Sequence, residues 1–367
     1  MNRLLHPLRL CVLFVMSFTV IAARAVQPEV VASGLEHPWA VTFLPQGRFL
    51  VTERPGRMRV VGADGKLGPP LAGVPEVVAR GQGGLLDVVL DSGFERNRTL
   101  YFCFSEPGEG GNSTALARAR LAAGDDRLTD LKILFRQQPK VASYQHFGCR
   151  IVEAPDGNLF LTLGERFSRP QDAQRLDTHL GKVVRVTKDG AVPPGNPFAG
   201  RAGALPEIWS YGHRNMQGAT WGPDGRLWTH EHGPQGGDEI NLPQPGRNYG
   251  WPVITYGEQY GGGKIGEGLT AKEGMEQPLH YWVPSIAPSG MAFLTSERYG
   301  AGWKGNLFVG SLKFGYLDRI ELAGGKVVRE HKLLEGIGRV RDVRQGPDGL
   351  LYIVTDEANG KLVRVNP

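Results

Sequence analysis

Residues 346–357 read GPDGLLYIVTDE, a turn sequence followed by a run of mostly apolar residues. Pro-Asp-Gly supplies the backbone conformations of a tight turn between antiparallel strands. The residues after it are typical of a strand that packs against both of its neighbours. The same unit recurs at 44–53 (LPQGRFLVTE), 95–105 (ERNRTLYFCFS), 154–165 (APDGNLFLTLGE), 222–233 (GPDGRLWTHEHG) and 302–313 (GWKGNLFVGSLK).

Six copies of one strand unit, separated by insertions of unequal size, predict an all-β chain folded as a six-bladed β-propeller. The irregular spacing argues against a β-helix, and the length argues against one β-sandwich. The strand at 361–365 ends the chain, and residues 28–35 can supply the outer strand that closes the ring. We expect residues 26–367 to form one propeller domain with long loop insertions. The longest, 166–205 and 242–300, should gather at one end of the ring and build the site. A helical turn or two is expected over 121–136.

Residues 1–25 have the features of a cleaved signal peptide. Arg3 and Arg9 form a basic region, an apolar run covers residues 10–22, and Ala23-Arg24-Ala25 is an A-x-A cleavage site. The apolar run is short for a membrane span, although an uncleaved anchor is the alternative. The sequence therefore predicts export, to the periplasm or beyond the cell, without a membrane span. In that compartment Cys103 and Cys149 can form a disulfide, and two buried free thiols agree with the sequence equally well.

The charge balance gives no sign of nucleic-acid binding. The chain has 42 Lys and Arg against 37 Asp and Glu. Three of the arginines lie in residues 1–25, so the exported chain would be close to neutral. A nucleic-acid footprint needs basic residues clustered on one face. Basic residues that matter should therefore act locally, on a small anionic ligand.

Polar residues with no evident structural purpose lie in loops next to the repeated strands. They occur in GQGGLLD (81–87), SYQHFGCR (143–150), SYGHRNMQG (210–218), SLKFG (311–315) and GRVRDV (338–343). The candidates are Gln82, His146, Arg214, Asn215, Lys313, Arg339 and Arg341. Each alone is a weak signal, and a lone histidine is more often structural. Together they suit a flat ligand with several negative charges at the mouth of a propeller.

The stretch WTHEHGPQGGDEIN (228–241) raises the question of a metal. His230 and His232, at i and i+2 on a strand, could hold zinc, but no third ligand is clear. Calcium prefers oxygen ligands, which makes the main-chain carbonyls of Gly233 and Pro234 better candidates for it. Proline has no N–H, and glycine allows the loop to turn its oxygens inward.

These motifs, in this order, resemble the soluble quinoprotein glucose dehydrogenase family, and within it the aldose sugar dehydrogenase branch. EHGPQGGDEIN followed by GRNYGWP is highly specific to that family, as is the order of the other motifs, and the resemblance covers essentially the whole chain after residue 25. It implies pyrroloquinoline quinone (PQQ) and Ca²⁺ as cofactors. It implies His146 as general base, with Gln82, Arg214, Asn215, Lys313, Arg339 and Arg341 contacting the cofactor. Gly233 and Pro234 match the calcium that coordinates the quinone, and Glu239 and Tyr249 match a second, structural calcium site.

The resemblance implies oxidation of aldose sugars at the anomeric carbon to lactones, with electrons passed to an acceptor that the sequence does not identify. We expect a monomer or homodimer. Gln145 stands where the glucose-oxidising branch has Asp, which puts the sugar contacts in doubt and suggests broad specificity. Two alternatives belong to other classes of protein. A calcium-dependent propeller lactonase or arylesterase would need carboxylates and amides that converge on the metal. A noncatalytic sugar-binding propeller would leave His146 and Arg214 without a purpose.

Overall fold

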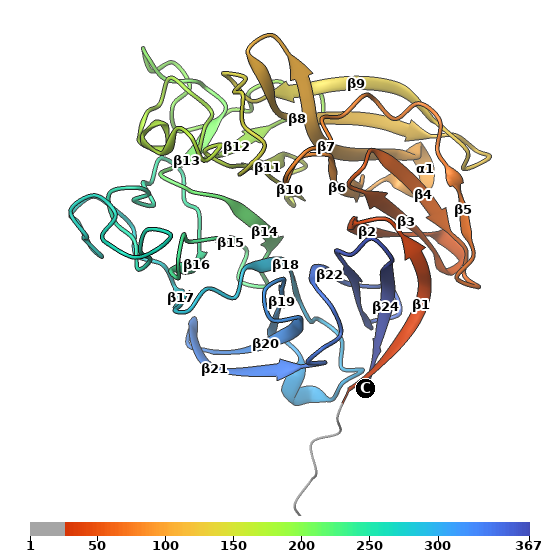
Figure 1. Ribbon diagram of the computed structural model, residues 1–367. Helices are drawn as coiled ribbons and strands as arrows, with labels where there is room; N and C mark the ends of the chain where they lie inside the picture. The colour runs from red at the N-terminus through yellow and green to blue at the C-terminus, as the bar shows by residue number, and fades with distance from the viewer. Residues whose placement is uncertain (1–25) are drawn as a thin grey trace, which may run out of the picture.

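The computed structural model describes residues 26–367 and shows a six-bladed β-propeller (Figure 1). Six antiparallel sheets of four strands each surround a central axis, and almost no helix is present among them. The prediction of an all-β propeller is confirmed. The predicted signal peptide, residues 1–25, lies outside the described residues. None of the helices between residues 26 and 367 has the length and hydrophobicity needed to span a membrane.

The blades follow one another along the chain, and blades 1 to 5 each run from their inner to their outer strand. Blade 1 contains β2 (Pro38–Leu44), β3 (Arg48–Glu53), β4 (Arg57–Val61) and β5 (Leu67–Pro70). Blade 2 contains β6 (Leu85–Leu90), β7 (Thr99–Gly108), β8 (Gly111–Leu121) and β9 (Leu128–Arg136), with the short helix α1 (Phe94–Asn97) between β6 and β7. Blade 3 contains β10 (Gly148–Glu153), β11 (Leu159–Leu163), β12 (Lys182–Val186) and β13 (Ile208–Tyr211).

The other half of the ring has the same plan. Blade 4 contains β14 (Met216–Trp221), β15 (Leu227–Glu231), β16 (Asp238–Asn241) and β17 (His280–Trp282). Blade 5 contains β18 (Pro288–Phe293), β19 (Leu307–Ser311), β20 (Tyr316–Ala323) and β21 (Lys326–Leu333). Blade 6 contains β22 (Val340–Gln345), β23 (Leu351–Thr355) and β24 (Gly360–Asn366), with β1 (Gln27–Leu35) as its outer strand. Three short 3-10 helices lie in the loops at Pro45–Gly47, Pro170–Gln174 and Ala301–Trp303.

Each of the six repeated sequence units forms the second strand of a blade, namely β3, β7, β11, β15, β19 and β23. The ring closes as expected, because β1 pairs antiparallel with β24 and so joins the two ends of the described chain. Second strands lie between two others of the same sheet, which explains why their burial is almost continuous; Leu351–Thr355, for example, is buried throughout.

A buried network of charges ties the inner strands together at the centre of the ring. Arg150 on β10 forms ion pairs with Asp342 on β22, at 2.8 Å, and with Asp87 on β6, at 3.3 Å. Its Nε donates to the carbonyl of Gln217 and its Nη2 to that of Arg341. All charges are paired, as burial in a medium of low dielectric requires. The network fixes the relative positions of the inner strands, and several polar groups of the site lie at or just before the starts of these strands.

Two expectations about local structure were wrong. Residues 128–136 form the strand β9, which pairs with β8, and residues 121–127 contain no helix. Residues 128–136 form a strand because the edge of β8 is available for pairing, and a prediction from local sequence does not take such a partner into account. The long insertions also divide between the two ends of the ring. Residues 187–207 join β12 to β13. Arg185, near the end of β12, pairs with Asp156 in the β10–β11 turn, which lies at the end of β10 opposite His146. The 187–207 connection therefore leaves β12 at the end of the ring opposite the His146 loop.

Candidate functional site

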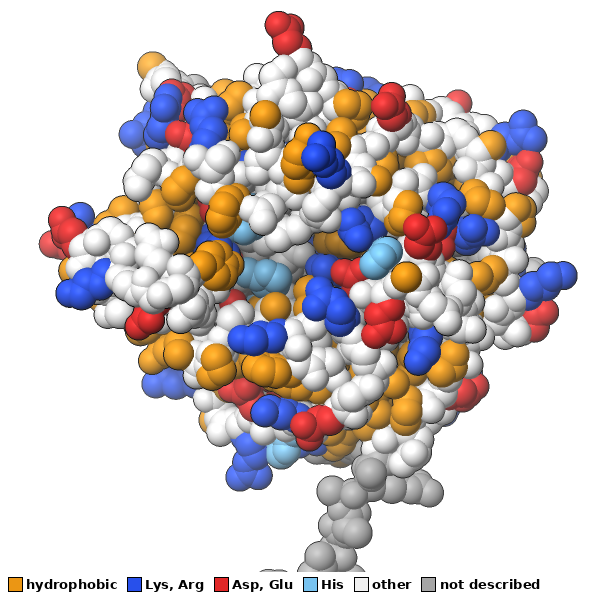
Figure 2. Space-filling view, in the orientation of Figure 1, with side chains coloured by type: hydrophobic (Ala, Val, Ile, Leu, Met, Phe, Trp, Pro, Cys, Tyr) orange, Lys and Arg blue, Asp and Glu red, His pale blue; other side chains and the backbone are white. Residues whose placement is uncertain are grey.

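A deep cavity of about 720 Å³ opens at one mouth of the ring. Its walls come from loops that precede the inner strands and loops that follow the second strands of several blades. Figure 2 shows this face, where Lys, Arg and His side chains gather around the central hollow. Five of the predicted residues line the cavity: Gln82, Asn215, Lys313, Arg339 and Arg341. Residues far apart in the sequence thus meet in one pocket.

The cavity carries more positive charge than its acidic residues balance. Arg341 pairs with Asp356 at 2.9 Å, and its buried Nε has no hydrogen-bond partner. Arg339 donates to the carbonyl of Leu312 and has no ion-pair partner within residues 26–367. The Lys313 ammonium lies over the ring of Phe314, at 5.1 Å, and likewise has no carboxylate partner among the described residues. A multiply anionic ligand would supply the missing partners.

Two amide side chains organise the wall next to the predicted base. Gln82 Oε1 accepts a hydrogen bond from the backbone N–H of His146, at 2.8 Å. Asn215 Oδ1 accepts from the backbone N–H of Gly148, at 3.3 Å. Gln217 donates to the Asn215 amide and accepts from Arg341. Besides facing the cavity, these amides therefore hold the His146 loop and one arginine in place.

His146 lies beside the cavity and is only 4% exposed. Its Nδ1 is 3.0 Å from Glu165 Oε1, and its Nε2 has no hydrogen-bond partner in the described chain. Burial lowers the pKa of His146 from its usual value of 6.5, and the nearby Arg214 lowers it further, while Glu165 raises it. The imidazole is therefore neutral at pH 7, with Nδ1 donating to Glu165 and Nε2 free to accept a proton. This arrangement suits a general base.

Arg214 is linked to His146 through Glu165. The backbone N–H of Glu165 donates to the carbonyl of Arg214. The backbone N–H of Arg214 donates to Glu231, and the Arg214 Nη1 donates to the carbonyls of His232, at 3.0 Å, and Gly233, at 2.8 Å. Two main-chain carbonyls thus converge on one cationic group. The Pro234 carbonyl accepts no hydrogen bond within residues 26–367. A Cβ on Gly233 would lie 2.1 Å from the Gly236 carbonyl oxygen, so the tight loop requires glycine there.

A second group of oxygen atoms lies behind this loop. Glu231, Glu239 and Tyr249 line a void of about 10 Å³, large enough for a single small occupant. Burial raises the pKa of Glu239 to about 8, and the charge of Glu231 contributes to the shift. The Tyr249 carbonyl accepts no hydrogen bond from residues 26–367, while its ring stacks on His213. Two carboxylates that repel each other beside an unused carbonyl are a donor set that suits calcium.

The two histidines of the H-E-H sequence do not form a zinc site. The His230 Nε2 atom is 3.2 Å from the Gly290 carbonyl, and the His232 Nε2 atom is 2.8 Å from the Pro288 carbonyl. Burial lowers the pKa of both rings, to about 3 for His230. Between residues 26 and 367, no three His, Cys, Asp or Glu side chains are grouped as metal ligands.

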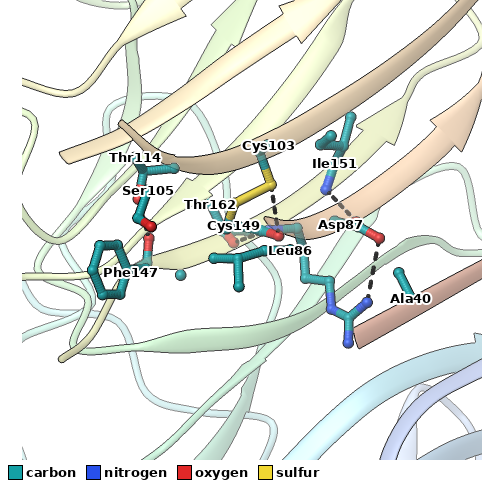
Figure 3. The surroundings of a disulfide bond; sticks show 12 residues. Ala40, Leu86, Asp87, Cys103, Ser105, Thr114, Phe147, Cys149, Ile151 and Thr162 are labelled. Carbon is teal, nitrogen blue, oxygen red and sulfur yellow. Dashed lines mark hydrogen bonds and ion pairs between the residues drawn. A yellow bond between two sulfur atoms is a disulfide. The ribbon is translucent and has the colours of Figure 1, made fainter. Parts of the chain in front are cut away.

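Cys103 and Cys149 form a disulfide, which decides between the two states that the sequence left open (Figure 3). Cys103 lies on β7 in blade 2, and Cys149 lies on β10 in blade 3, three residues after His146. Thr114 Oγ1 donates to the carbonyl of Phe147 in the same region. The segment that carries His146 is therefore attached covalently to the neighbouring blade.

The sequence reasoning missed several residues of the site, among them Arg54, Glu165 and Asp356. Each of them follows the second strand of its blade directly, or within two residues, as Lys313 and Gly233 do. Arg54 and Asp356 line the cavity, and Glu165 holds His146. The repeat itself could have revealed them, because all six copies place the residue after the second strand at the same end of the ring.

The fold and the pocket define a class of protein: a six-bladed β-propeller whose central cavity is cationic and has a buried His–Glu pair at its side. The sequence profile of the glucose/sorbosone dehydrogenase family matches residues 35–364. The chain belongs to this family.

Individual relatives agree with the assignment. An aldose sugar dehydrogenase of Escherichia coli is 46% identical over 351 residues, which is 94% of each chain. The crystal structure of the soluble aldose sugar dehydrogenase of Escherichia coli in its apo form superimposes with a TM-score of 0.90, covering 94% of this chain and all of that one. The PQQ-bound aldose sugar dehydrogenase of Streptomyces coelicolor is 29% identical, with a TM-score of 0.76, and the match covers 94% and 99% of the two chains.

Proposed function

We propose that this protein is a PQQ- and calcium-dependent dehydrogenase that oxidises aldose sugars at the anomeric carbon to lactones, with broad sugar specificity. The observation that carries the proposal is the neutral His146, held by Glu165 next to a cavity with unpaired cations. The relative from Streptomyces coelicolor binds PQQ, and its similarity to this chain supports the same cofactor here. Carboxylates of such a ligand would pair with Lys313, Arg339 and Arg341, and its ring would lie against Gln82 and Asn215.

The chain's own residues perform the proton chemistry. His146 Nε2 accepts the proton of the anomeric hydroxyl as the C–H bond breaks and the lactone C=O forms. Glu165 accepts the Nδ1–H, which fixes the tautomer and stabilises the imidazolium that results. Arg214 places positive charge near His146, where it would stabilise negative charge on a bound cofactor. When bound, PQQ would accept the hydride and calcium would polarise its carbonyl.

The calcium that serves the quinone would be held by the carbonyls of Gly233 and Pro234. A carbonyl oxygen has two lone pairs, so that of Gly233 can accept from Arg214 and also face a cation. Glu239 and the Tyr249 carbonyl would hold the second calcium, and Glu231 would share its charge. In this proposal residues 26–367 act as one domain.

We also propose that the protein works outside the cytoplasm, in the periplasm, after cleavage near Ala25. The signal-like sequence of residues 1–25 supports this, and so does the Cys103–Cys149 disulfide, a bond that is stable in oxidising compartments.

The two alternative functions fit the site less well. A calcium-dependent lactonase requires carboxylates and amides that converge on a metal in the channel, whereas the carboxylates of Asp87 and Asp342 at the centre of this ring are paired with Arg150. A noncatalytic sugar-binding propeller has no need of a buried histidine whose free nitrogen lies beside a cationic cavity. The unpaired cations of the cavity favour the dehydrogenase.

Reconstitution tests the proposed function. Protein stripped of metal and cofactor should reduce a dye with aldoses only after both PQQ and Ca²⁺ are added. Either addition alone should give little activity, because the carbonyl loop and the cations act on the same bound molecule. Dye reduction by the fully stripped protein, or no reduction after both additions, would overturn the proposal. Comparable efficiency on several mono- and disaccharides is expected, and a preference for one sugar by about 10⁴-fold would indicate a tightly hydrogen-bonded sugar site.

Calcium alone should stabilise the apoprotein through the second site. An ion that binds only the folded state adds about 2.7 kcal/mol to the free energy of unfolding at 100 times its Kd. Denaturant unfolding with and without Ca²⁺ measures this gain. Glu239→Gln should remove most of it, whereas Glu109→Gln, in the exposed β7–β8 turn, should keep it. An undiminished gain in Glu239→Gln would place the structural calcium elsewhere.

A further inference from the structure

Two aromatic side chains flank the proposed catalytic residues and remain exposed to solvent. Phe167 is 46% exposed, and its ring meets the His146 imidazole edge to face, with the ring centroids 5.2 Å apart. Tyr260 is 62% exposed, and Arg214 Nη2 donates to its phenol oxygen at 3.3 Å. Neither ring lines the cationic cavity. Large exposed aromatic side chains beside reactive groups need an explanation, because burying them is favourable.

The two rings come from different insertions. Phe167 lies in the segment between β11 and β12, and Tyr260 lies in the long segment between β16 and β17. Both are tied to the catalytic residues they adjoin. The Phe167 N–H donates to Glu165, the carboxylate that also holds His146. The Glu165 N–H in turn donates to the carbonyl of Arg214. The base, the arginine and the two aromatic rings therefore form one connected group.

The backbone of both segments supports a role in binding. Phe167 has a φ of 62°, a left-handed conformation that costs free energy in a bulky residue and places its ring against His146. Tyr260 begins a tip formed by Gly261, Gly262 and Gly263, none of which has an atom near its Cβ position. The base of the tip is held by hydrogen bonds of Glu258 and Gly261 to Gln235, the residue after Pro234. One ring is thus held rigidly and the other lies on a loop with room to adjust.

We propose that Phe167 and Tyr260 are the residues that recognise the sugar, each by stacking on an apolar C–H face of a pyranose ring. This inference rests on the proposed function and deepens it. The substrate must reach His146 Nε2 from outside the cavity if the cavity holds the anionic cofactor, and the two rings border that approach. Sugar rings present flat C–H faces that are common to many aldoses. Recognition by such faces gives affinity without selecting the configuration of each hydroxyl, which accounts for broad specificity.

Alanine substitutions measure the contribution of each ring to substrate binding. Phe167→Ala and Tyr260→Ala should each raise KM for aldoses about tenfold, the loss expected when an aromatic contact is removed. The turnover number at saturating sugar, its pH dependence and the affinity for PQQ should change little, because His146, Glu165 and the cations remain. Tyr260→Phe keeps the ring and should retain a KM close to that of the wild type. Leu131→Ala removes an apolar side chain that is 42% exposed on β9, the outer strand of blade 2, and serves as control.

Conservative variants keep the test sharp if an alanine variant folds poorly. Phe167→Tyr should restore the wild-type KM, whereas Phe167→Leu, apolar but not flat, should not. The inference is overturned if both alanine variants oxidise aldoses with the wild-type KM, or if they lose turnover while KM stays constant. A wild-type protein that oxidises no aldose after reconstitution would instead contradict the proposed function, so the two failures are distinguishable.

Discussion

Replacement of His146 by glutamine is expected to lower kcat by about 10²–10⁴-fold, the usual cost of losing general-base catalysis. Glutamine has a similar reach and keeps a polar group beside Glu165, but it cannot accept the proton. The affinity for PQQ should be almost unchanged, because Lys313, Arg339 and Arg341 line the cavity and His146 does not. Titration of the apoprotein with PQQ, followed by steady-state kinetics, measures the two quantities separately.

The pH dependence gives an independent reading of the same residue. Burial holds the pKa of His146 below 6.5, so the wild-type base is neutral at pH 7 and becomes protonated only at lower pH. Activity of the wild type should therefore fall as the pH drops through that lowered pKa, and His146→Gln should lack this acid limb. Glu165→Gln removes the charge that raises the pKa of His146, so the acid limb should move to lower pH while kcat decreases.

Arg341→Ala is the matched comparison, because it changes the cavity and leaves the base intact. Its PQQ affinity should fall first, and turnover should recover at saturating PQQ. A His146→Gln enzyme with near-normal turnover would show that the histidine is structural. Loss of PQQ binding in His146→Gln would instead show that this histidine helps to hold the cofactor, and it would also contradict the assignment as a base alone.

Removal of the Cys103–Cys149 disulfide is expected to lower the free energy of unfolding by about 4 kcal/mol. The bond closes a loop with a sequence separation of 46 residues, and the figure follows from the entropy that such a closure removes from the unfolded chain. Denaturant unfolding of Cys103→Ala/Cys149→Ala, compared with the wild type in its oxidised form, measures the difference.

Measurements on the reduced wild type separate the effect of the covalent bond on stability from the effect of the cysteine side-chain volume. Both sulfurs are fully buried, so alanine at these positions also leaves small cavities. Reduced wild-type protein keeps the volume of the sulfurs and should lose most of the same stability. Equal stability of the oxidised and reduced forms would mean that packing between β7 and β10, and not the covalent bond, holds blades 2 and 3 together.

The repeat was readable from the sequence because each second strand is bounded by its own turn and is buried on both faces, so local chemistry and tertiary position agree there. The outer strands were harder to predict. β9, at 128–136, has mixed polar and apolar residues, and it is a strand because β8 offers it a free edge. The insertion at 187–207 lies at one end of the ring because β12 ends there. The local sequence does not show at which end of a blade a strand ends.

The site also has a part that the sequence indicated and a part that only the structure revealed. Residue types in short motifs indicated His146, Arg214 and the cations, together with the oxygen-rich loop at Gly233 and Pro234, since base, anion and calcium chemistry each require particular atoms. The sequence by itself thus determined the propeller, its ring closure and the family. Only the tertiary structure decided that Cys103 is bonded to Cys149, that Glu165 holds His146, and that Phe167 lies against His146 and Tyr260 against Arg214. Those relations join residues from different strands and loops, and they arise only when the blades bring the ends of those segments within contact distance.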